Sequence, residues 1–263
     1  MPELDAVLFD AGGVLMVPRP DVLGEVLAPF GARLDEATLV RAHFAGVHAL
    51  DLAGEETGGW AAYRSAYVTH AGVPTGRVRP ATQAMDEIFD HWLWSHPMPG
   101  ARQALAALHE RGVPIGVVSN AAGQVEGDLC RVGICQVGDG GEGVPVRCVV
   151  DSSVVGVSKP DPGIFAPALA ALGLEPSPRV AYVGDTVLYD VRAATAAGLT
   201  PLLHDPHGFH ERRPTWGRPR TLRSLADLVA LLTPPAGREL RCPTTDGGAS
   251  TWHAPRSGGS ARG

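Results

Sequence analysis

The sequence predicts an α/β fold: a doubly wound, mostly parallel sheet with an inserted small all-helical cap. Three observations predict this fold. Short apolar runs alternate with amphipathic helical segments at the start of the chain and again from about residue 98. Each run is too short for a helix and is bounded by Gly, Pro, Asp or Ser. Residues 16–97 interrupt this alternation with helical patterns alone.

The predicted strands are β-branched or otherwise apolar runs, as in strands buried on both faces of a parallel sheet. They cover residues 6–9, 115–118, 148–150, 180–183 and 201–203. Three helical patterns separate the later runs, over residues 100–111, 161–172 and 186–197, and each ends at a glycine. Strand–helix alternation of this kind indicates parallel strands, whose carboxyl ends form the ligand-binding edge of the sheet.

The insertion reads as four amphipathic helices, roughly 21–30, 36–50, 57–71 and 78–92, with no strand-like run between them. Placed after the first strand, it is expected to form a lid over the carboxyl end of that strand. A last helix is predicted over 221–232, and the Gly-, Pro-, Ser- and Thr-rich tail after it is expected to be disordered. The predicted domains are therefore a core (1–15 and 98–233), a cap (16–97) and a tail (234–263).

Composition excludes several classes of function. The net charge is −6 and the basic residues are scattered, which argues against a nucleic-acid partner. No apolar stretch approaches the roughly 20 residues of a membrane span, so no membrane partner is expected. The four cysteines lack CxxC spacing and are interpreted as reduced thiols of a cytoplasmic protein. Nothing in the sequence decides the oligomeric state.

Lys159 is the only lysine among 22 basic residues. One explanation is codon bias in a GC-rich genome, which favours arginine everywhere. The other is chemical: the position requires a compact point charge on a flexible side chain, which a planar guanidinium does not provide. Composition alone leaves both explanations open.

Polar or reactive residues gather at the predicted strand ends. Asp10 follows the first strand and Ser119-Asn120 the second, whereas Asp185 follows the strand 180–183 with Asp190 five residues later. A carboxylate at a strand tip suits a nucleophile or metal ligand, a hydroxyl with turn amides suits phosphate, and paired carboxylates suit Mg²⁺. Each residue taken alone is equally consistent with a helix or turn cap.

The order of these segments resembles the haloacid dehalogenase-like (HAD) hydrolase superfamily. Asp10 in VLFDAGGVL corresponds to motif one, Ser119 in IGVVSNA to motif two and Lys159 in GVSKPDPGIF to motif three. The segment YVGDTVLYD, with Asp185 and Asp190, corresponds to motif four. The resemblance covers residues from about 5 to 205, and the helical insertion corresponds to the family's cap between motifs one and two.

The resemblance implies a Rossmann-like core and Mg²⁺-dependent phosphoryl transfer from a small phosphorylated molecule through an aspartyl-phosphate. It implies that Asp10 attacks phosphorus, while Ser119, Asn120 and Lys159 bind the phosphoryl oxygens. It also implies that Mg²⁺ is held by Asp10, the main-chain carbonyl of Gly12 and Asp185, with Asp190 supporting the site. Positive charge collected around the reacting centre is what attack by one anion on another requires.

Gly12 departs from the family pattern. Phosphatases of the family carry a second aspartate two residues after the nucleophile, which protonates the leaving oxygen and then activates water. Three hypotheses follow: a phosphatase that is slow or borrows an acid–base group from the cap; a reaction whose leaving group needs no proton, as in dehalogenases; or a catalytically weak binding protein. Dehalogenases work without a metal. The pair Asp185 and Asp190 suits a metal ion and therefore disfavours a dehalogenase. Phosphonatases use a cap lysine, which residues 16–97 lack.

Side chains of the insertion supply the remaining candidates. The titratable groups that could replace the missing acid–base residue are His43, His48, Asp51, Asp86 and Glu87. The side chains that could contact a substrate are Tyr63, Arg64, Tyr67, His91, Trp92 and Trp94, although aromatic residues at helical spacing equally suit core packing.

Overall fold

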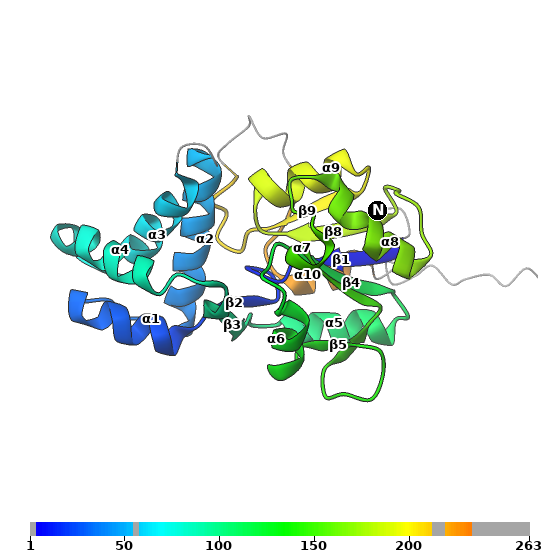
Figure 1. Cartoon of the computed structure of the whole chain (residues 1–263), viewed down its shortest axis with the longest axis horizontal. Coiled ribbons are helices and arrows are strands. Elements are labelled where there is room, and N and C mark those ends of the chain that lie inside the picture. The colour runs from blue at the N-terminus through cyan, green and yellow to red at the C-terminus, as the bar shows by residue number, and fades with distance from the viewer. Residues whose placement is uncertain (1–3, 55–57, 212–218, 233–263) are drawn as a thin grey trace, which may run out of the picture. The chain divides into compact units, whose positions relative to one another are not determined.

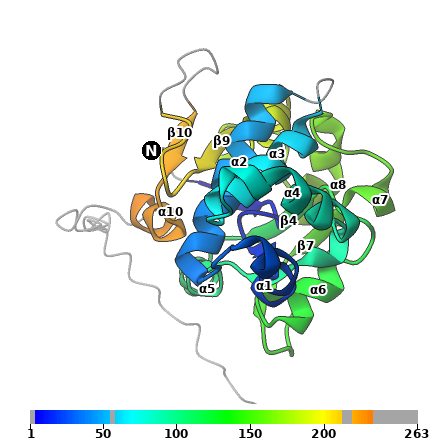
Figure 2. The ribbon, with the colours of Figure 1, turned by 90° about the vertical axis from the view of Figure 1, so that its left-hand side faces the viewer.

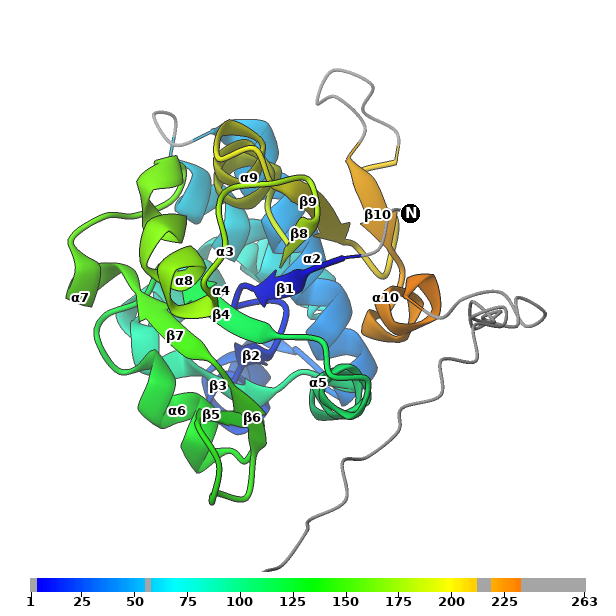
Figure 3. The same ribbon diagram turned by 90° about the vertical axis from the view of Figure 1, so that its right-hand side faces the viewer.

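The computed structural model describes residues 4–54, 58–211 and 219–232, and a six-stranded sheet lies at its centre (Figure 3). In order across the sheet the strands are β10 (Arg220–Leu222), β9 (Thr200–His204), β8 (Val180–Gly184), β1 (Ala6–Phe9), β4 (Ile115–Ser119) and β7 (Cys148–Asp151). Every neighbouring pair is parallel. Because the chain moves outward from β1 through β4 and then crosses to β8, the strand order reverses at β1, and a ligand crevice is expected there.

Side chains alternate between the two faces of the sheet. In β1, Ala6 and Leu8 pack in one apolar cluster and Val7 and Phe9 in another. The first cluster includes side chains of α8 (Ala166–Leu172) and α9 (Arg192–Ala196). The second includes side chains of α5 (Ala101–Glu110), α6 (Val125–Arg131) and α10 (Leu225–Leu231). Helices therefore cover both faces, and the predicted doubly wound α/β fold is confirmed.

Local sequence fixes where these helices begin and end. Asp161 accepts a hydrogen bond from the main-chain N–H of Gly163 and caps a 3₁₀ turn (Pro162–Phe165) that leads into α8. Gly173 ends α8 with φ of 67°, a conformation that favours glycine. After β8, a π-helical turn (Val187–Val191) leads into α9. A short helix α7 (Ser152–Val155) follows β7, and β5 (Cys135–Val137) pairs with β6 (Val144–Val146) outside the main sheet.

The inserted segment forms four helices that pack on one another (Figures 1 and 2). They are α1 (Pro20–Leu27), α2 (Glu36–Ala53), α3 (Gly59–His70) and α4 (Val78–Glu87). The 3₁₀ turns Ala28–Phe30, Thr75–Arg77 and His91–Leu93 join or follow them. Gly46 allows α2 to approach α3 closely, because a Cβ there would lie 2.7 Å from the Tyr63 ring. Asp35 caps α2 by accepting from the N–H of Thr38.

One expectation about strands and one about a helix are corrected. The range 16–97 contains an antiparallel pair, β2 (Met16–Pro18) and β3 (Trp94–Pro97), so the insertion is not all-helical at its ends. These strands are 3 and 4 residues long, contain proline and pair across the whole insertion, so no local pattern predicts them. The helix expected over 221–232 begins at Leu225, because residues 220–222 pair with β9 and Ser224 forms a capping box with Asp227.

Helix α4 ends at Glu87, short of the expected residue 92, and Asp90 caps the separate turn that follows it. Cys130, Cys135 and Cys148 are free thiols, whereas Cys242 lies outside the described residues. The tail 234–263 also lies outside them, and the division into core, cap and tail stays a prediction. None of the described helices is long and apolar enough to cross a membrane.

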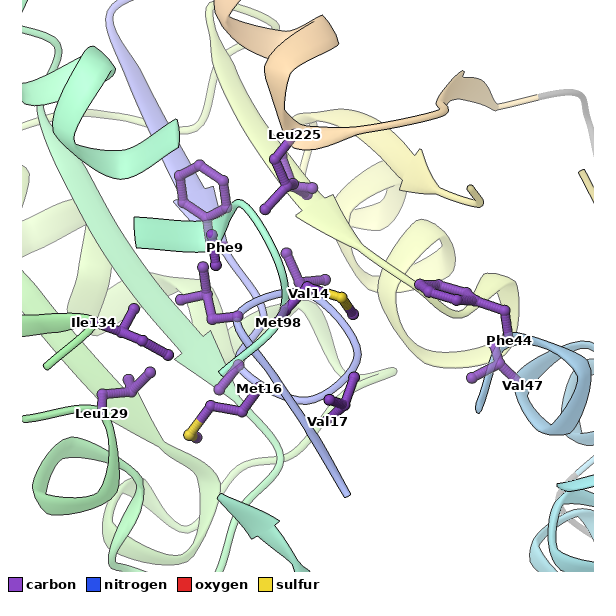
Figure 4. Close-up of a cluster of buried hydrophobic side chains, with 14 of the residues drawn as sticks. Phe9, Val14, Met16, Val17, Phe44, Val47, Met98, Leu129, Ile134 and Leu225 are labelled. Atoms are coloured by element: carbon purple, nitrogen blue, oxygen red, sulfur yellow. The ribbon is translucent and has the colours of Figure 1, made fainter. Parts of the chain in front are cut away.

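The ribbon β2–β3 joins the insertion to the sheet through shared apolar packing. Met16, Val17 and Met98 belong to the same buried cluster as Phe9 of β1 and Phe44 of α2. Figure 4 shows side chains of this cluster between the sheet and α2. Apolar side chains of the insertion and of the core therefore belong to one continuous buried cluster.

A polar contact also ties α2 to the core. The Asp51 carboxylate accepts hydrogen bonds from the main-chain N–H groups of Val187 and Leu188, both at 2.8 Å. His210 Nε2 lies 2.9 Å from the same carboxylate, and its Nδ1 lies 3.4 Å from Asp205. Burial disfavours the charged imidazole, but the hydrogen bonds to Asp205 and Asp51 outweigh it and raise the pKa of His210 to about 9. At neutral pH a protonated His210 therefore bridges the two carboxylates, with the His48 ring packed edge-on against it.

This bridge predicts pH-dependent stability. A histidine pKa that rises on folding stabilises the protein fully below the unfolded pKa of about 6.5 and loses that effect as the pH passes about 9. We expect His210→Gln to lower the free energy of unfolding by about 3 kcal/mol more at about pH 6 than at about pH 10. Urea denaturation at both values measures this difference. His109→Gln, a substitution of an exposed histidine on α5, is the control; an equal loss at both pH values would contradict the bridge.

Candidate active site

The polar side chains of the strand ends meet in one cavity of about 530 Å³ at the carboxyl edge of the sheet. Asp10 follows β1, Ser119 ends β4 and Asp185 follows β8, the three strands around the reversal of strand order. The residues predicted from sequence to form the site all line this cavity: Asp10, Gly12, Ser119, Asn120, Lys159, Asp185 and Asp190. The fold thus brings together side chains spread over 180 positions of the chain.

Lys159 lies at the centre of the polar cluster. Its Nζ is 2.9 Å from Asp10 Oδ1, 2.7 Å from Asp190 Oδ1 and 2.7 Å from the Tyr182 hydroxyl. The side chain is buried, which opposes the charged form, but Asp10 and Asp190 outweigh burial and raise the pKa of Lys159 to about 12. Lys159 is therefore an ammonium at neutral pH.

Asn120 fixes the main chain at Lys159. Its amide oxygen accepts from the Lys159 N–H at 2.8 Å, and its amide nitrogen donates to the Lys159 carbonyl at 3.0 Å. This paired contact connects the end of β4 to the loop that carries the lysine. In this arrangement Asn120 positions Lys159, and its expected role in substrate binding stays a prediction.

Asp190 is held by donors on both carboxylate oxygens. Oδ1 accepts from Lys159 and from the Tyr182 hydroxyl, whereas Oδ2 accepts from the Thr186 main-chain N–H at 2.9 Å and from its hydroxyl at 2.5 Å. Burial alone would raise the pKa of Asp190, but Lys159 and these hydrogen bonds lower it. Asp190 is thus a fixed anion that orients the ammonium.

Asp10, Asp185 and Asp190 each offer an oxygen within 4.8 Å of the other two, and all three side chains are buried. Burial, together with the neighbouring carboxylates, raises the pKa of Asp10 and that of Asp185 despite the opposing effect of Lys159. When all three carboxylates are ionised, their negative charge exceeds the single positive charge of Lys159. A hard divalent cation with oxygen ligands such as Mg²⁺ fits this donor set.

Two glycines make room for these carboxylates. A Cβ on Gly13, whose φ is +70°, would lie 1.9 Å from Asp185 Oδ2. A Cβ on Gly184 would lie 2.3 Å from the Cβ of Asp190. Any larger residue at either position would displace a site carboxylate, so packing requires glycine at positions 13 and 184.

Gly12 is different, because its backbone stays outside the positive-φ region and there is space beside it. A Cβ there would lie 3.4 Å from Trp94 Cδ1 and 3.6 Å from Trp94 Nε1, which are ordinary contacts. The position of the family's second aspartate therefore faces an indole ring from β3.

His43 of α2 extends the site into the insertion. Its Nε2 lies 3.0 Å from Asp185 Oδ2 and its Nδ1 lies 2.8 Å from the Tyr63 hydroxyl. Burial lowers the pKa of His43 to about 3, so the ring is neutral and carries one N–H. With Asp185 ionised, Nε2–H donates to the carboxylate and Nδ1 accepts from the tyrosine. Of the five acid–base candidates predicted from sequence, His43 alone lines the cavity.

Sequence reasoning also missed several residues. Tyr182 and Thr186 were not predicted, although Thr186 directly follows Asp185 and Tyr182 lies two residues before Gly184 on β8. Of the candidate substrate contacts, Tyr63, His91 and Trp94 line the cavity, whereas Arg64, Tyr67 and Trp92 do not. Trp60 and Phe89 line it but were not among those candidates.

The contact between His43 and Asp185 predicts an effect on metal affinity. Residues that orient a ligand by hydrogen bonding typically change affinity about 10- to 100-fold when they are lost. We expect His43→Phe to weaken Mg²⁺ binding at least about tenfold, measured by titration calorimetry without substrate. His109→Phe on α5 is the matched control. Unchanged affinity in His43→Phe would show that the histidine does not orient Asp185.

Comparisons with known proteins agree with this geometry. The family model described as "Hydrolase: haloacid dehalogenase-like hydrolase" matches residues 4–198. Haloacid dehalogenase-like hydrolase domain-containing protein 3 of Mus musculus is 32% identical over 134 residues, 51% of this chain and 50% of that protein. Phosphoglycolate phosphatase of Rhodospirillum rubrum is 29% identical over 214 residues, 78% of this chain and 80% of that enzyme. The chain thus spans about half the length of the mouse relative.

Solved structures show the same fold. A HAD family hydrolase from Deinococcus radiodurans, with bound phosphate and sodium, is 25% identical with a TM-score of 0.53 and covers 89% of this chain and 100% of its own. A HAD phosphatase from Thermococcus onnurineus is 20% identical with a TM-score of 0.53 and covers 87% of this chain and 98% of its own. Taken with the converging strand ends, these matches show that the chain belongs to the haloacid dehalogenase-like hydrolase family.

Proposed function

We propose that this protein is a Mg²⁺-dependent phosphatase that acts on a small phosphorylated metabolite through an aspartyl-phosphate on Asp10. One observation carries the proposal: Asp10, the Lys159 ammonium and the carboxylates of Asp185 and Asp190 meet within one cavity. The relatives named as phosphoglycolate, glyceraldehyde 3-phosphate and phosphoserine phosphatases support phosphoryl chemistry.

The residues have distinct roles in the proposed reaction. Asp10 attacks phosphorus, the bond to the leaving oxygen breaks, and water then releases phosphate from Asp10. Lys159, already 2.9 Å from Asp10, neutralises a phosphoryl oxygen during attack. Ser119, buried at the end of β4, and the turn after it bind the remaining oxygens. Asp10, Asp185 and the Gly12 carbonyl would hold Mg²⁺, which when bound would supply further positive charge for the transferring group.

Proton transfer is the step that this chain is least equipped for. Gly12 supplies no carboxyl group beside the leaving oxygen, and general acid–base help of this kind typically contributes about 10²–10⁴-fold. The first half-reaction therefore depends on the acidity of the leaving group. The second depends on water that no side chain at position 12 activates.

Two alternative functions, a dehalogenase and a weak binding protein, are tested by Mg²⁺-dependent phosphate hydrolysis. A dehalogenase would need no second aspartate, but the three clustered carboxylates favour a metal, which such enzymes do not use. Gly12 favours a catalytically weak binding protein, which would bind phosphate without turnover. Mg²⁺-dependent hydrolysis separates the proposed phosphatase from both.

The proposal predicts a burst of nitrophenol from p-nitrophenyl phosphate in the presence of Mg²⁺, followed by slower steady turnover. The leaving group is good enough to depart unprotonated, whereas release of phosphate from Asp10 lacks a base. Stopped-flow absorbance at enzyme concentrations near that of the substrate measures both phases. Binding without any burst would favour the weak binding protein.

Asp10→Asn is expected to abolish both phases, because an amide does not attack phosphorus. Asp5→Asn, a surface carboxylate paired with Arg179, is the control and is expected to leave turnover unchanged. Steady turnover of Asp10→Asn above about a tenth of the parent rate would contradict the assignment of the nucleophile.

Gly12→Asp is expected to raise steady turnover of an alkyl phosphate about tenfold or more, since the added carboxyl group reaches the leaving oxygen. The space beside Trp94 accommodates the new side chain. Gly12→Asn, which has the same size without an acid, is the matched control. If both variants gave the parent rate, protonation at position 12 would not limit the reaction.

A further inference from the structure

We infer that the substrate carries its phosphate on an apolar aromatic hydroxyl, so that the phosphatase is selective for aryl phosphates without a second anionic group. The inference rests on the proposed phosphatase function and concerns the part of the cavity that side chains of the insertion line. Three features of that part carry it: an aromatic wall, a shortage of cations and the ring that faces Gly12.

The aromatic wall consists of Trp60, Tyr63, Phe89 and Trp94, all of which line the cavity. They come from α3, from the segment after α4 and from β3. Met16, Val47 and Leu50 extend the apolar lining. The leaving group of a phosphate ester that Asp10 attacks would therefore lie against rings and aliphatic side chains.

The rings of this wall contact one another. Trp60 and Tyr63 have centroids 5.4 Å apart, Trp60 and Phe89 5.7 Å, and Phe89 and Trp94 5.0 Å, with edge or tilted geometry. Rings at this spacing are in van der Waals contact and leave no room between them for a quaternary ammonium. The wall thus offers one continuous apolar surface, which suits a flat ring better than it suits a cation enclosed on several sides.

The charges of the lining disfavour a second anion on the substrate. Among the described residues, Lys159 is the only lysine or arginine that lines the cavity, and its donors are engaged by Asp10, Asp190 and Tyr182. The carboxylates of Asp90 and Asp128 also line the cavity. His91 Nδ1 lies 2.6 Å from Asp90. A carboxylate or second phosphate on the substrate would find no free cation there.

Trp94 connects the wall to the chemistry. Trp94 Cδ1 lies 3.4 Å from the place where a Cβ at position 12 would begin, two residues after the nucleophile. The leaving group would therefore lie near an indole, with no carboxylic acid at position 12. A phenol has a pKa of about 10, far below the value of about 16 for water. Asp10 forms the new P–O bond as the aryl oxygen departs with the bonding electrons. The phenolate takes a proton from water, hydrolysis of the aspartyl-phosphate releases phosphate, and the net reaction consumes one water.

A panel of four substrates tests the inference. Acetyl phosphate has a good leaving group and no ring, and reports on the proposed function alone. Phenyl and 2-naphthyl phosphate have similar leaving groups but different apolar areas, whereas 4-carboxyphenyl phosphate adds an anion. We expect kcat/KM for 2-naphthyl phosphate to exceed that for phenyl phosphate about fivefold or more. We expect kcat/KM for 4-carboxyphenyl phosphate to be at least about tenfold lower than kcat/KM for phenyl phosphate.

Variants of the wall localise the effect. Trp60→Ala and Trp94→Leu are expected to raise KM for 2-naphthyl phosphate about tenfold. Trp92→Ala is the matched control, because Trp92 is exposed and does not line the cavity. Urea denaturation of each variant beside the parent protein shows whether the variant is folded.

The outcomes separate the two proposals. Absence of Mg²⁺-dependent turnover with all four substrates would overturn the phosphatase function itself. Turnover of acetyl phosphate with equal or better kcat/KM for 4-carboxyphenyl phosphate than for phenyl phosphate would overturn the aryl selectivity alone. So would equal effects of Trp60→Ala and Trp92→Ala on 2-naphthyl phosphate.

Discussion

The site depends on a buried ammonium placed between two carboxylates. Lys159 bridges Asp10 and Asp190 at 2.9 and 2.7 Å, and a third buried carboxylate, Asp185, lies close by. Burying a charge is expensive unless partners and hydrogen bonds offset the loss of water. The Tyr182 hydroxyl, Asn120 and Thr186 provide those contacts, so the surroundings of Lys159 are specified in detail. The same ammonium that stabilises this cluster also faces the place where a phosphoryl group would gain negative charge.

The inserted helices complete the site and do more than cover it. His43 of α2 hydrogen-bonds to Asp185. Asp51, further along the same helix, accepts hydrogen bonds from main-chain N–H groups just after Asp185. Both contacts act on the turn that follows β8. Movement of α2 would therefore change the surroundings of Asp185 directly. Trp94, at the return from the insertion to the core, sets the character of the space beside Gly12.

Much of this arrangement is predictable from sequence because strand ends carry the chemistry. The doubly wound sheet follows from the alternation of short apolar runs with helices, and Asp10, Ser119, Lys159 and Asp185 are found because each lies just beyond such a run or in a recognisable motif. The residues that were missed act across long sequence distances. In the sequence Tyr182 resembles any buried strand residue, and only the structure shows that its hydroxyl accepts a hydrogen bond from Lys159. The pairing of β2 with β3 joins short, irregular segments. The contact of Asn120 with the main chain of Lys159 likewise depends on loop geometry that no local pattern encodes.

The central claim is that Asp10 carries the phosphoryl group during turnover, and it can be measured directly. The protein is mixed with acetyl phosphate and Mg²⁺, quenched with acid within the first turnover, digested and analysed by mass spectrometry. The account predicts one added phosphoryl group on the peptide that contains Asp10, absent when Mg²⁺ is chelated and absent in Asp10→Asn. Hydrolysis of acetyl phosphate with no such adduct, or with the phosphoryl group on another residue, would contradict it.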